Sequence, residues 1–323
     1  MRKFVRYISL FAALLVLASL VSCGEGDVTT VDDTTDVPVV EPTPLPYEAV
    51  GIDSAALISG VNCQFALLTK VDGLEAVATK NSSELMYPAS MTKVMTFIVA
   101  YENAKSLEDK LTITREVKSK YADAYRVGID VGDIITVEQL LYSLILESDA
   151  DAALLLADYI AGGEEDFAVL MNEKCAELGL SSTHFTNAVG MHDNNHYTTA
   201  AEMTSIFAYA LEIPLFREII TMEKFVTYLE YYKDGVLTPY RMTFHNTTIS
   251  PIKGRFAQNN VSLSFGEGAI IGGKTGYTDE AKYCLALLVR GEGGEEYILI
   301  TAKASTPRDN AGDSLYICEN YAK

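Results

Sequence analysis

Positive charge is scarce in this sequence of 323 residues. Lysine and arginine number 25 against 44 aspartates and glutamates, which gives a formal net charge of −19. A balance this acidic argues against nucleic acid as a partner, because phosphate binding needs basic surface. It is typical of a solvated surface that keeps a protein soluble. Hydrophobic residues make up 49% of the chain, enough for a real core.

Several catalytic motifs are also missing. The sequence has no G-x-S-x-G elbow, which argues against an α/β-hydrolase, and no glycine loop of the phosphate-binding kind. Among its four histidines, His192 and His196 have a spacing that could place two ligands on one helical face. They lie instead in the polar stretch GMHDNNHYTT, with no evident third ligand. Cysteine spacing does not match a zinc site. We expect no metal and no cofactor.

The N-terminus has the pattern of an export signal. A basic segment, MRKFVR, precedes the apolar run 7–21, which is short for a membrane span. The run closes on LVSC, which resembles a bacterial lipobox. That resemblance implies a lipoprotein signal peptide over residues 1–22 and a lipid on Cys23. An ordinary secretory signal with a chance cysteine is the alternative. Both interpretations place the rest of the chain outside the cytoplasmic membrane.

A tether is predicted between this signal and the folded part. Residues 24–49 contain seven acidic residues, four prolines and no basic residue, without the periodic apolar pattern of a helix or strand. Such a composition stays extended and disordered. We therefore expect residues 23–49 to be a lipid-anchored linker and residues 50–323 to be the folded domain.

Four further cysteines lie within the folded part, widely spaced and each among apolar residues. Disulfides are possible in an exported protein, but four cysteines in a domain of this size do not make a disulfide scaffold. We expect buried free thiols at Cys63, Cys175, Cys284 and Cys318.

The order of predicted elements is strands, then helices, then strands. Apolar and alternating segments flank turn signals near both ends, and helical periodicity with capping residues such as Thr136 dominates the middle. This order indicates an α+β fold in which one antiparallel sheet is built from both termini and carries an inserted helical subdomain. The expected sheet part covers 50–110 and 245–323, and the mostly helical part covers 111–244. Expected elements are a hairpin over 63–80, a helix from 90 to about 104, helices from 136 to 211, a second hairpin over 224–244, strands at 268–275, 281–290 and 296–304, and a closing helix over about 307–321.

The segment YPASMTKVMTF places a lysine beside a buried stripe. On a helix starting near Ser90, the hydroxyl of Ser90 and the amine of Lys93 lie one turn apart and can touch. Free N–H groups at the helix start favour an anion beside Ser90. Burial lowers the pKa of a lysine, so Lys93 can accept a proton near neutral pH. The pair matches a Ser–Lys activated nucleophile, although a bare S-x-x-K is usually a surface helix.

A second motif lies far downstream at Lys274-Thr275-Gly276. S-x-x-K followed by K-T-G is the signature of the penicillin-recognising serine acyltransferases. Together with segments such as LADYIAGGEEDF, HYTTAAEM, FHNTT and GGKTGYTDEAKYCLALL, these motifs resemble the D-alanyl-D-alanine carboxypeptidases of the S11 serine peptidase family. The likeness covers about residues 50–320 and implies a fold of the β-lactamase and DD-peptidase type.

The resemblance implies a role for each matching residue. Ser90 would be the acylated nucleophile, Lys93 its general base, and Ser148 a proton relay to the leaving amine. Backbone N–H groups of Ser90 and Tyr277 would form the oxyanion hole. Arg308 falls about where the family keeps an arginine for the substrate's C-terminal carboxylate, although a surface arginine at a helix start is the alternative. The implied substrate-binding residues are Lys274, Thr275, Gly276, Tyr277, Thr278 and Arg308.

Two segments depart from the family pattern. The stretch that usually reads S-G-N-D-A is Ser148-Asp149-Ala150-Asp151-Ala152, so Ala150 replaces an asparagine that normally positions the lysine and a substrate amide. Losing such a group typically costs on the order of 10²–10³ in rate. A neighbouring carboxylate could compensate only in part, because it accepts without donating and raises the pKa of Lys93. The family's N-P-H-G-L loop also lacks its proline and histidine, reading NAVGM over 187–191.

These observations support three functions. The first is a D-alanyl-D-alanine carboxypeptidase that trims the terminal D-alanine from peptidoglycan stem peptides and is inhibited by β-lactams. The second is a catalytically impaired relative that binds wall peptides or partners, favoured by Ala150. The third is a β-lactamase, for which no convincing deacylating glutamate is found; related endopeptidases stay open. The expected location is extracytoplasmic, on a membrane through the lipid at Cys23, without the family's frequent C-terminal β-domain.

Overall fold

The computed structural model describes residues 52, 54–121 and 124–323. The predicted signal peptide, Cys23 and the linker 23–49 lie outside these residues. No helix in the described ranges is long and apolar enough to cross a membrane.

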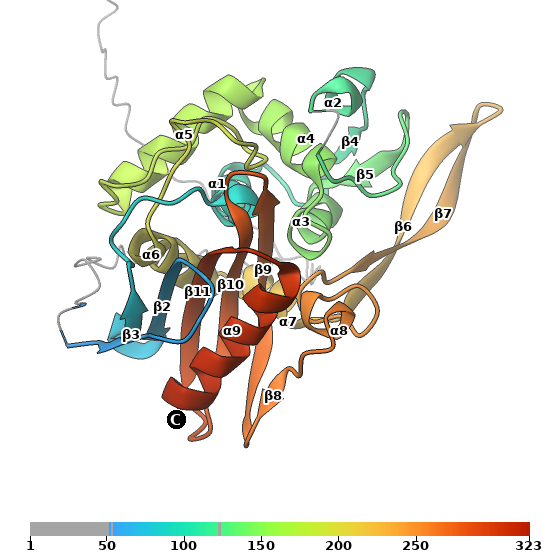
Figure 1. Ribbon diagram of the computed structural model, residues 1–323. Helices are drawn as coiled ribbons and strands as arrows, with labels where there is room; N and C mark the ends of the chain where they lie inside the picture. Colours follow the sequence, from blue (N-terminus) through green and yellow to red (C-terminus); the bar gives the residue numbers. More distant parts are fainter. Residues whose placement is uncertain (1–51, 53, 122–123) are drawn as a thin grey trace, which may run out of the picture. The chain divides into compact units, whose positions relative to one another are not determined.

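A seven-stranded sheet joins the two ends of the described chain (Figure 1). The N-terminal hairpin β2–β3 pairs with the C-terminal strand β11 through β2, and the register places Leu68 opposite Leu299. All neighbouring strands are antiparallel except β1 and β3. In sheet order the strands are β1 Ala56–Leu57, β3 Ala76–Lys80, β2 Phe65–Lys70, β11 Glu296–Ala304, β10 Lys282–Arg290, β9 Gly268–Thr278 and β8 Ser264–Phe265.

Helices cover both faces of this sheet. The closing helix α9 packs on β10 and β11, while α6 packs on β2 and β11 and α7 packs on β9 (Figure 1). The alternation of strand residues separates the two cores, so Leu287 faces the α9 side and Leu288 faces the other helices. The helices are α1 Lys93–Asn103, α2 Arg115–Ser119, α3 Val137–Leu146, α4 Ala150–Ala161, α5 Glu164–Glu177, α6 Ala200–Leu211, α7 Pro214–Thr221, α8 Arg255–Gln258 and α9 Pro307–Tyr321.

Local signals in the sequence explain where several helices begin and end. Thr136 and Gln139 form the capping box predicted at the start of α3. Thr199 caps α6, and Gly162 ends α4 in the left-handed conformation. The α+β arrangement with a sheet built from both ends is confirmed by the solved structures reported below.

The middle of the chain also contains a second sheet that sequence patterns did not predict in full. The expected hairpin over 224–244 is present, and two short strands extend it to the order β4-β5-β6-β7. Figure 1 shows the hairpin projecting away from the helices. The strands are β4 Lys110–Thr112, β5 Ile134–Thr136, β6 Lys224–Lys233 and β7 Val236–His245.

The four cysteines of the described chain are free and buried, as expected from their apolar surroundings. Burial raises the pKa of Cys284 to about 11, so this thiol stays protonated at neutral pH.

Candidate active site

The predicted nucleophile pair lies at the junction of a short turn and helix α1. Ala89–Thr92 form one turn of 3₁₀ helix, and α1 begins directly at Lys93. The Nζ atom of Lys93 lies 3.1 Å from Oγ of Ser90, within hydrogen-bond distance. Lys93 is completely buried, and this burial lowers its pKa to about 7 against the opposing charges of Asp149 and Glu164. The amine is therefore neutral in a large fraction of molecules at physiological pH.

A backbone carbonyl supplies the second contact of Lys93. The oxygen of Val189 accepts a hydrogen bond from Nζ at 2.6 Å. Val189 belongs to the loop that lacks the family's proline and histidine. A neutral amine that donates one N–H to this carbonyl keeps its lone pair available for the Ser90 hydroxyl. The altered loop thus still orients the lysine.

The position of that carbonyl depends on Gly190. This residue has φ +83°, and a Cβ atom there would lie 2.1 Å from the carbonyl oxygen of Ala89. The side chain of Asn187 accepts hydrogen bonds from the N–H groups of Gly190 and Met191 and closes the turn. The loop therefore packs tightly against the turn that carries Ser90.

Ser148 and Lys274 face each other across the site. Ser148 has the left-handed backbone conformation, φ +62°, which is uncommon for a residue with a side chain and often marks a functional position. Nζ of Lys274 donates to Oγ of Ser148 and to the carbonyl of Thr275, both at 2.7 Å. Lys274 is buried, and its pKa lies well below the usual value because of that burial, with the charges of Lys93 and Arg255 adding to the effect. A second pair of a serine and a buried lysine thus lines the site together with Ser90 and Lys93.

Strand β9 lines the other side of the site. A Cβ atom on Gly276 would lie 3.0 Å from the carbonyl of Pro88 and 3.3 Å from the nitrogen of Ser90, so this glycine lets the strand closely approach the turn that carries Ser90. The hydroxyl of Thr275 lies 3.1 Å from that of Thr247, which precedes α8. Tyr277 and Thr278 continue the same wall. All five predicted residues from 274 to 278 thus lie at the site.

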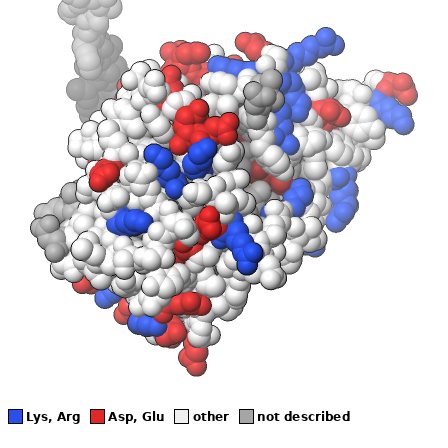
Figure 2. Space-filling model, in the orientation of Figure 1, with Lys and Arg blue, Asp and Glu red and all other residues white. Residues whose placement is uncertain are grey.

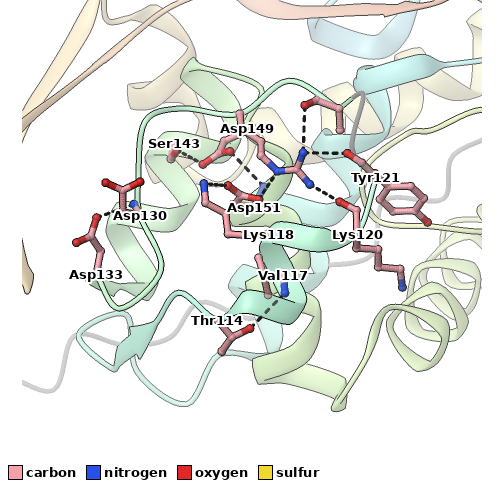
Figure 3. A network of polar contacts seen from close by, with 12 residues as sticks. Thr114, Val117, Lys118, Lys120, Tyr121, Asp130, Asp133, Ser143, Asp149 and Asp151 are labelled. Carbon is pink, nitrogen blue, oxygen red and sulfur yellow. Dashed lines mark hydrogen bonds and ion pairs between the residues drawn. The ribbon is translucent and has the colours of Figure 1, made fainter.

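The segment with the missing asparagine is held by ion pairs instead (Figure 3). Asp149 caps α4 and accepts a hydrogen bond from Ser143, while Asp151 pairs with Lys118 and with Arg126 at 2.7 Å each. Arg126 also donates to the backbone carbonyls of the preceding loop, including that of Lys120. Neither carboxylate forms a hydrogen bond with Lys93. Asp149 acts on Lys93 only through its charge, and its own pKa is raised to about 6 by burial and by Asp151.

These groups surround a cavity of about 780 Å³, lined among others by Ser90, Lys93, Ser148, Thr275 and Tyr277. Glu147, also at the wall, is buried and accepts hydrogen bonds from Tyr125 and Lys253 and from the N–H of His245. Through these contacts Glu147 connects three segments of the cavity wall. Figure 2 shows acidic and basic side chains interspersed over the visible face, without one large patch of a single sign.

Arg255 is the arginine that lines this cavity. It lines the wall, donates to Asn310 at 2.9 Å and lies over the ring of Tyr283 at 5.2 Å. No carboxylate of the described chain pairs with it, and burial lowers its pKa. Arg308, predicted for this role, is exposed at the start of α9 and is not among the residues that line the cavity.

Residues that the sequence did not single out contribute much of this wall: Tyr125, Glu147, Val189, Thr247, Lys253 and Arg255. A backbone carbonyl such as that of Val189 has no signature in the sequence. Thr247 lies in FHNTT, a segment that carried the resemblance, so this residue could have been found.

His196 is a core residue in the described structure. Its Nε2 lies 2.7 Å from Oγ1 of Thr92, and the N–H of Thr186 donates to its Nδ1. Burial lowers its pKa to about 3, so the ring is neutral, and its contact with Thr92 supports the turn that carries Ser90. His192 packs instead against the edge of Tyr87.

The fold and this arrangement of Ser90, Lys93, Ser148 and Lys274 match the pattern expected of the serine DD-peptidase class. Residues 54–305 match the peptidase S11 family of D-alanyl-D-alanine carboxypeptidases, and the chain belongs to this family.

Individual relatives agree with this assignment. The chain is 33% identical over 249 residues to the D-alanyl-D-alanine carboxypeptidase DacF of Bacillus subtilis, covering 76% of this chain and 58% of that protein. It is 32% identical over 241 residues to the D-alanyl-D-alanine carboxypeptidase of Streptomyces strain K15, covering 71% and 77%. The crystal structure of the Streptomyces K15 DD-transpeptidase superposes with a TM-score of 0.70 and 26% identity, over 80% of this chain and 96% of that one.

Proposed function

We propose that this protein is a serine-type D-alanyl-D-alanine carboxypeptidase that removes the terminal D-alanine from peptidoglycan stem peptides. The contact between Ser90 and the buried amine of Lys93 carries the proposal, because it pairs a nucleophile with a base whose pKa is about 7. Family membership supplies the substrate class.

Acylation follows from the positions of the two serine–lysine pairs. Lys93 removes the proton of Ser90 as Oγ attacks the carbonyl between the two D-alanines. The N–H groups of Ser90 and Tyr277 stabilise the negative oxygen that forms. Ser148 then gives its proton to the departing amine and receives in return the proton that Lys93 took from Ser90, while Lys274 holds the Ser148 hydroxyl through its hydrogen bond. Free D-alanine leaves, and Lys93 is neutral again. The acyl group stays on Ser90 as an ester.

Deacylation uses the same base. Water loses a proton to Lys93 and attacks the ester carbonyl, and Ser90 recovers its proton when the bond to Oγ breaks. The carbonyl of Val189 holds Lys93 in place through both half-reactions. An amine as acceptor in place of water would give transpeptidation, so the products distinguish these two outcomes.

Arg255 is our candidate for the substrate's terminal carboxylate. Its guanidinium already has a stacking partner and one hydrogen bond, and its remaining N–H groups can bind a carboxylate in a bidentate manner. Thr275 lies on the same wall and can donate its hydroxyl. Arg308 stays an alternative from the family pattern, to be separated by comparing Arg255→Lys and Arg308→Lys.

An impaired relative that only binds wall peptides is the second candidate, favoured by Ala150. Incubation with a fluorescent penicillin and with a stem pentapeptide separates the two functions. We expect labelling and D-alanine release from the unmodified protein and neither from Ser90→Ala, while exposed Ser83→Ala serves as a control. Labelling with no more than one D-alanine released per protein molecule would point to a failed deacylation step, and the absence of both would leave only binding.

The lipid anchor is a separate proposal based on the lipobox-like segment ending at Cys23. If Cys23 carries the lipid, Cys23→Ser should move the expressed protein from the membrane fraction to the soluble fraction of the cell envelope. Unchanged fractionation would contradict the anchor without touching the proposed reaction.

A further inference from the structure

A second cavity of about 300 Å³ lies beside the one that contains Ser90. Met86, Tyr87 and Tyr197 form part of an apolar and aromatic wall, and Glu280 and Lys303 supply its charges. Glu280 lines both cavities, which makes them neighbours. None of these residues takes part in the reaction proposed above.

A β-bulge brings Lys303 to this cavity. The pairing of β10 with β11 shifts between Tyr283 and Leu285, and Lys303 has the left-handed backbone conformation, φ +60°. In a regular strand, Lys303 and its neighbour Ala302 would face opposite sides of the sheet. Here both line the same cavity. Bulges re-aim side chains in this way and are frequent next to active sites.

The two charges in the cavity are not neutralised by each other. The ammonium of Lys303 forms no ion pair or hydrogen bond with any described residue, and the basic group within 4.0 Å of Glu280 is His192. An anionic and a cationic group therefore line one cavity without forming an ion pair with each other. That arrangement is complementary to a ligand whose end carries both an ammonium and a carboxylate.

The second cavity and Arg255 lie toward opposite faces of the seven-stranded sheet. Arg255 stacks on Tyr283, which packs with the core on the α9 side of the sheet. The second cavity includes Phe65 and Ala302, which belong to the core on the opposite side. A peptide with its terminal carboxylate at Arg255 and its reacting carbonyl at Ser90, as proposed above, can continue toward Glu280, which lines both cavities.

We propose that the second cavity binds the side chain of the residue directly before the two D-alanines. Glu280 takes its ammonium and Lys303 its carboxylate, so the enzyme selects a diaminodicarboxylic acid over lysine, which has only the ammonium. This inference rests on the proposed function, because it assumes that Ser90 attacks a stem peptide.

Binding to the Ser90→Ala protein tests the selection without turnover. Two stem pentapeptides that differ only in this residue would be titrated by calorimetry. We expect about tenfold tighter binding of the diaminodicarboxylic peptide, the size of one charge-assisted contact. Lys303→Gln in the Ser90→Ala background should abolish the preference. Lys282→Gln, an exposed lysine with the same left-handed backbone that lines neither cavity, should preserve it.

Equal affinity for the two peptides, or the same loss in both lysine variants, would overturn the selection. Release of D-alanine from both peptides at equal rates would overturn it as well, while leaving the proposed function intact. A binding preference without any D-alanine release from the unmodified protein would support the selection and contradict the proposed reaction. The two proposals can therefore fail separately.

Discussion

Two segments of the cavity wall depart from the family pattern, and they differ in whether they still give Lys93 a hydrogen-bond partner. The loop 187–191 has lost its proline and histidine, yet its backbone places the Val189 carbonyl 2.6 Å from Lys93. The segment 148–152 has lost an asparagine, and no described side chain there makes a hydrogen bond to Lys93 in its place. A function carried by the backbone tolerates changed side chains, whereas a function carried by an amide side chain is lost with it.

The contrast between segments 187–191 and 148–152 matters only if Lys93 is the catalytic base. Lys93→Met should lower the rate of penicillin acylation by about 10³ or more, because general-base catalysis alone contributes about 10²–10⁴. The folded-state pKa of about 7 lies below the ordinary lysine value of 10.5, so between these values the unfolded chain binds more protons than the folded one. The buried amine therefore destabilises the fold, most strongly below pH 7.

Lys93→Met should accordingly raise the melting temperature by a few degrees at pH 7 while it abolishes labelling. Scanning calorimetry and a gel-based labelling assay measure the two effects. A lower melting temperature would show that the lysine contributes more through its contact with Val189 than burial costs. Lys118→Met, which removes an ion pair with Asp151 and not the base, is the matched control.

The pH dependence of acylation follows from the pKa of Lys93, which is about 7. Only neutral Lys93 can accept the proton of Ser90, so the rate should rise about tenfold per pH unit up to about pH 7 and level off above it. Stopped-flow acylation by a chromogenic cephalosporin between pH 5 and 9 gives the profile. A midpoint near 10 would mean that the carboxylates of Asp149 and Glu164 outweigh burial.

Gly190→Ala tests the backbone segment directly. The added Cβ would lie 2.1 Å from the Ala89 carbonyl, so the loop must move away from Lys93. We expect acylation to fall by about 10², the typical cost of one lost positioning contact. Gly235→Ala is the control, because Gly235 also has a positive φ, +79°, but has nothing within 4 Å of the added atom. Equal effects on acylation in the two variants would show that backbone strain, and not the Val189 contact, is responsible.

The same contrast explains what the sequence could predict. The spacing of S-x-x-K fixes two side chains one helical turn apart, so the contact between Ser90 and Lys93 was predictable, and their catalytic roles stay predictions. The α+β fold followed from the order of elements and is confirmed by the similar solved structures. The Val189 carbonyl and the Lys303 bulge were not predictable, because backbone positions depend on distant packing. Arg255 was not predicted as a residue of the cavity, because it meets Tyr283 only in the folded chain.

Restoring the lost amide is the smallest change and the sharpest test of the side-chain segment. Ala150 is buried, and its N–H donates to the Tyr125 carbonyl, so an asparagine there has to displace its neighbours slightly. We expect Ala150→Asn to raise D-alanine release by about tenfold, less than the full value of such a contact, because overpacking offsets part of the gain. Ala150→Leu adds similar volume without an amide and should lower the rate. If both variants are equally slow, the packing around Ala150 has adapted to the smaller residue, and the cavity wall of this protein no longer has a place for the asparagine.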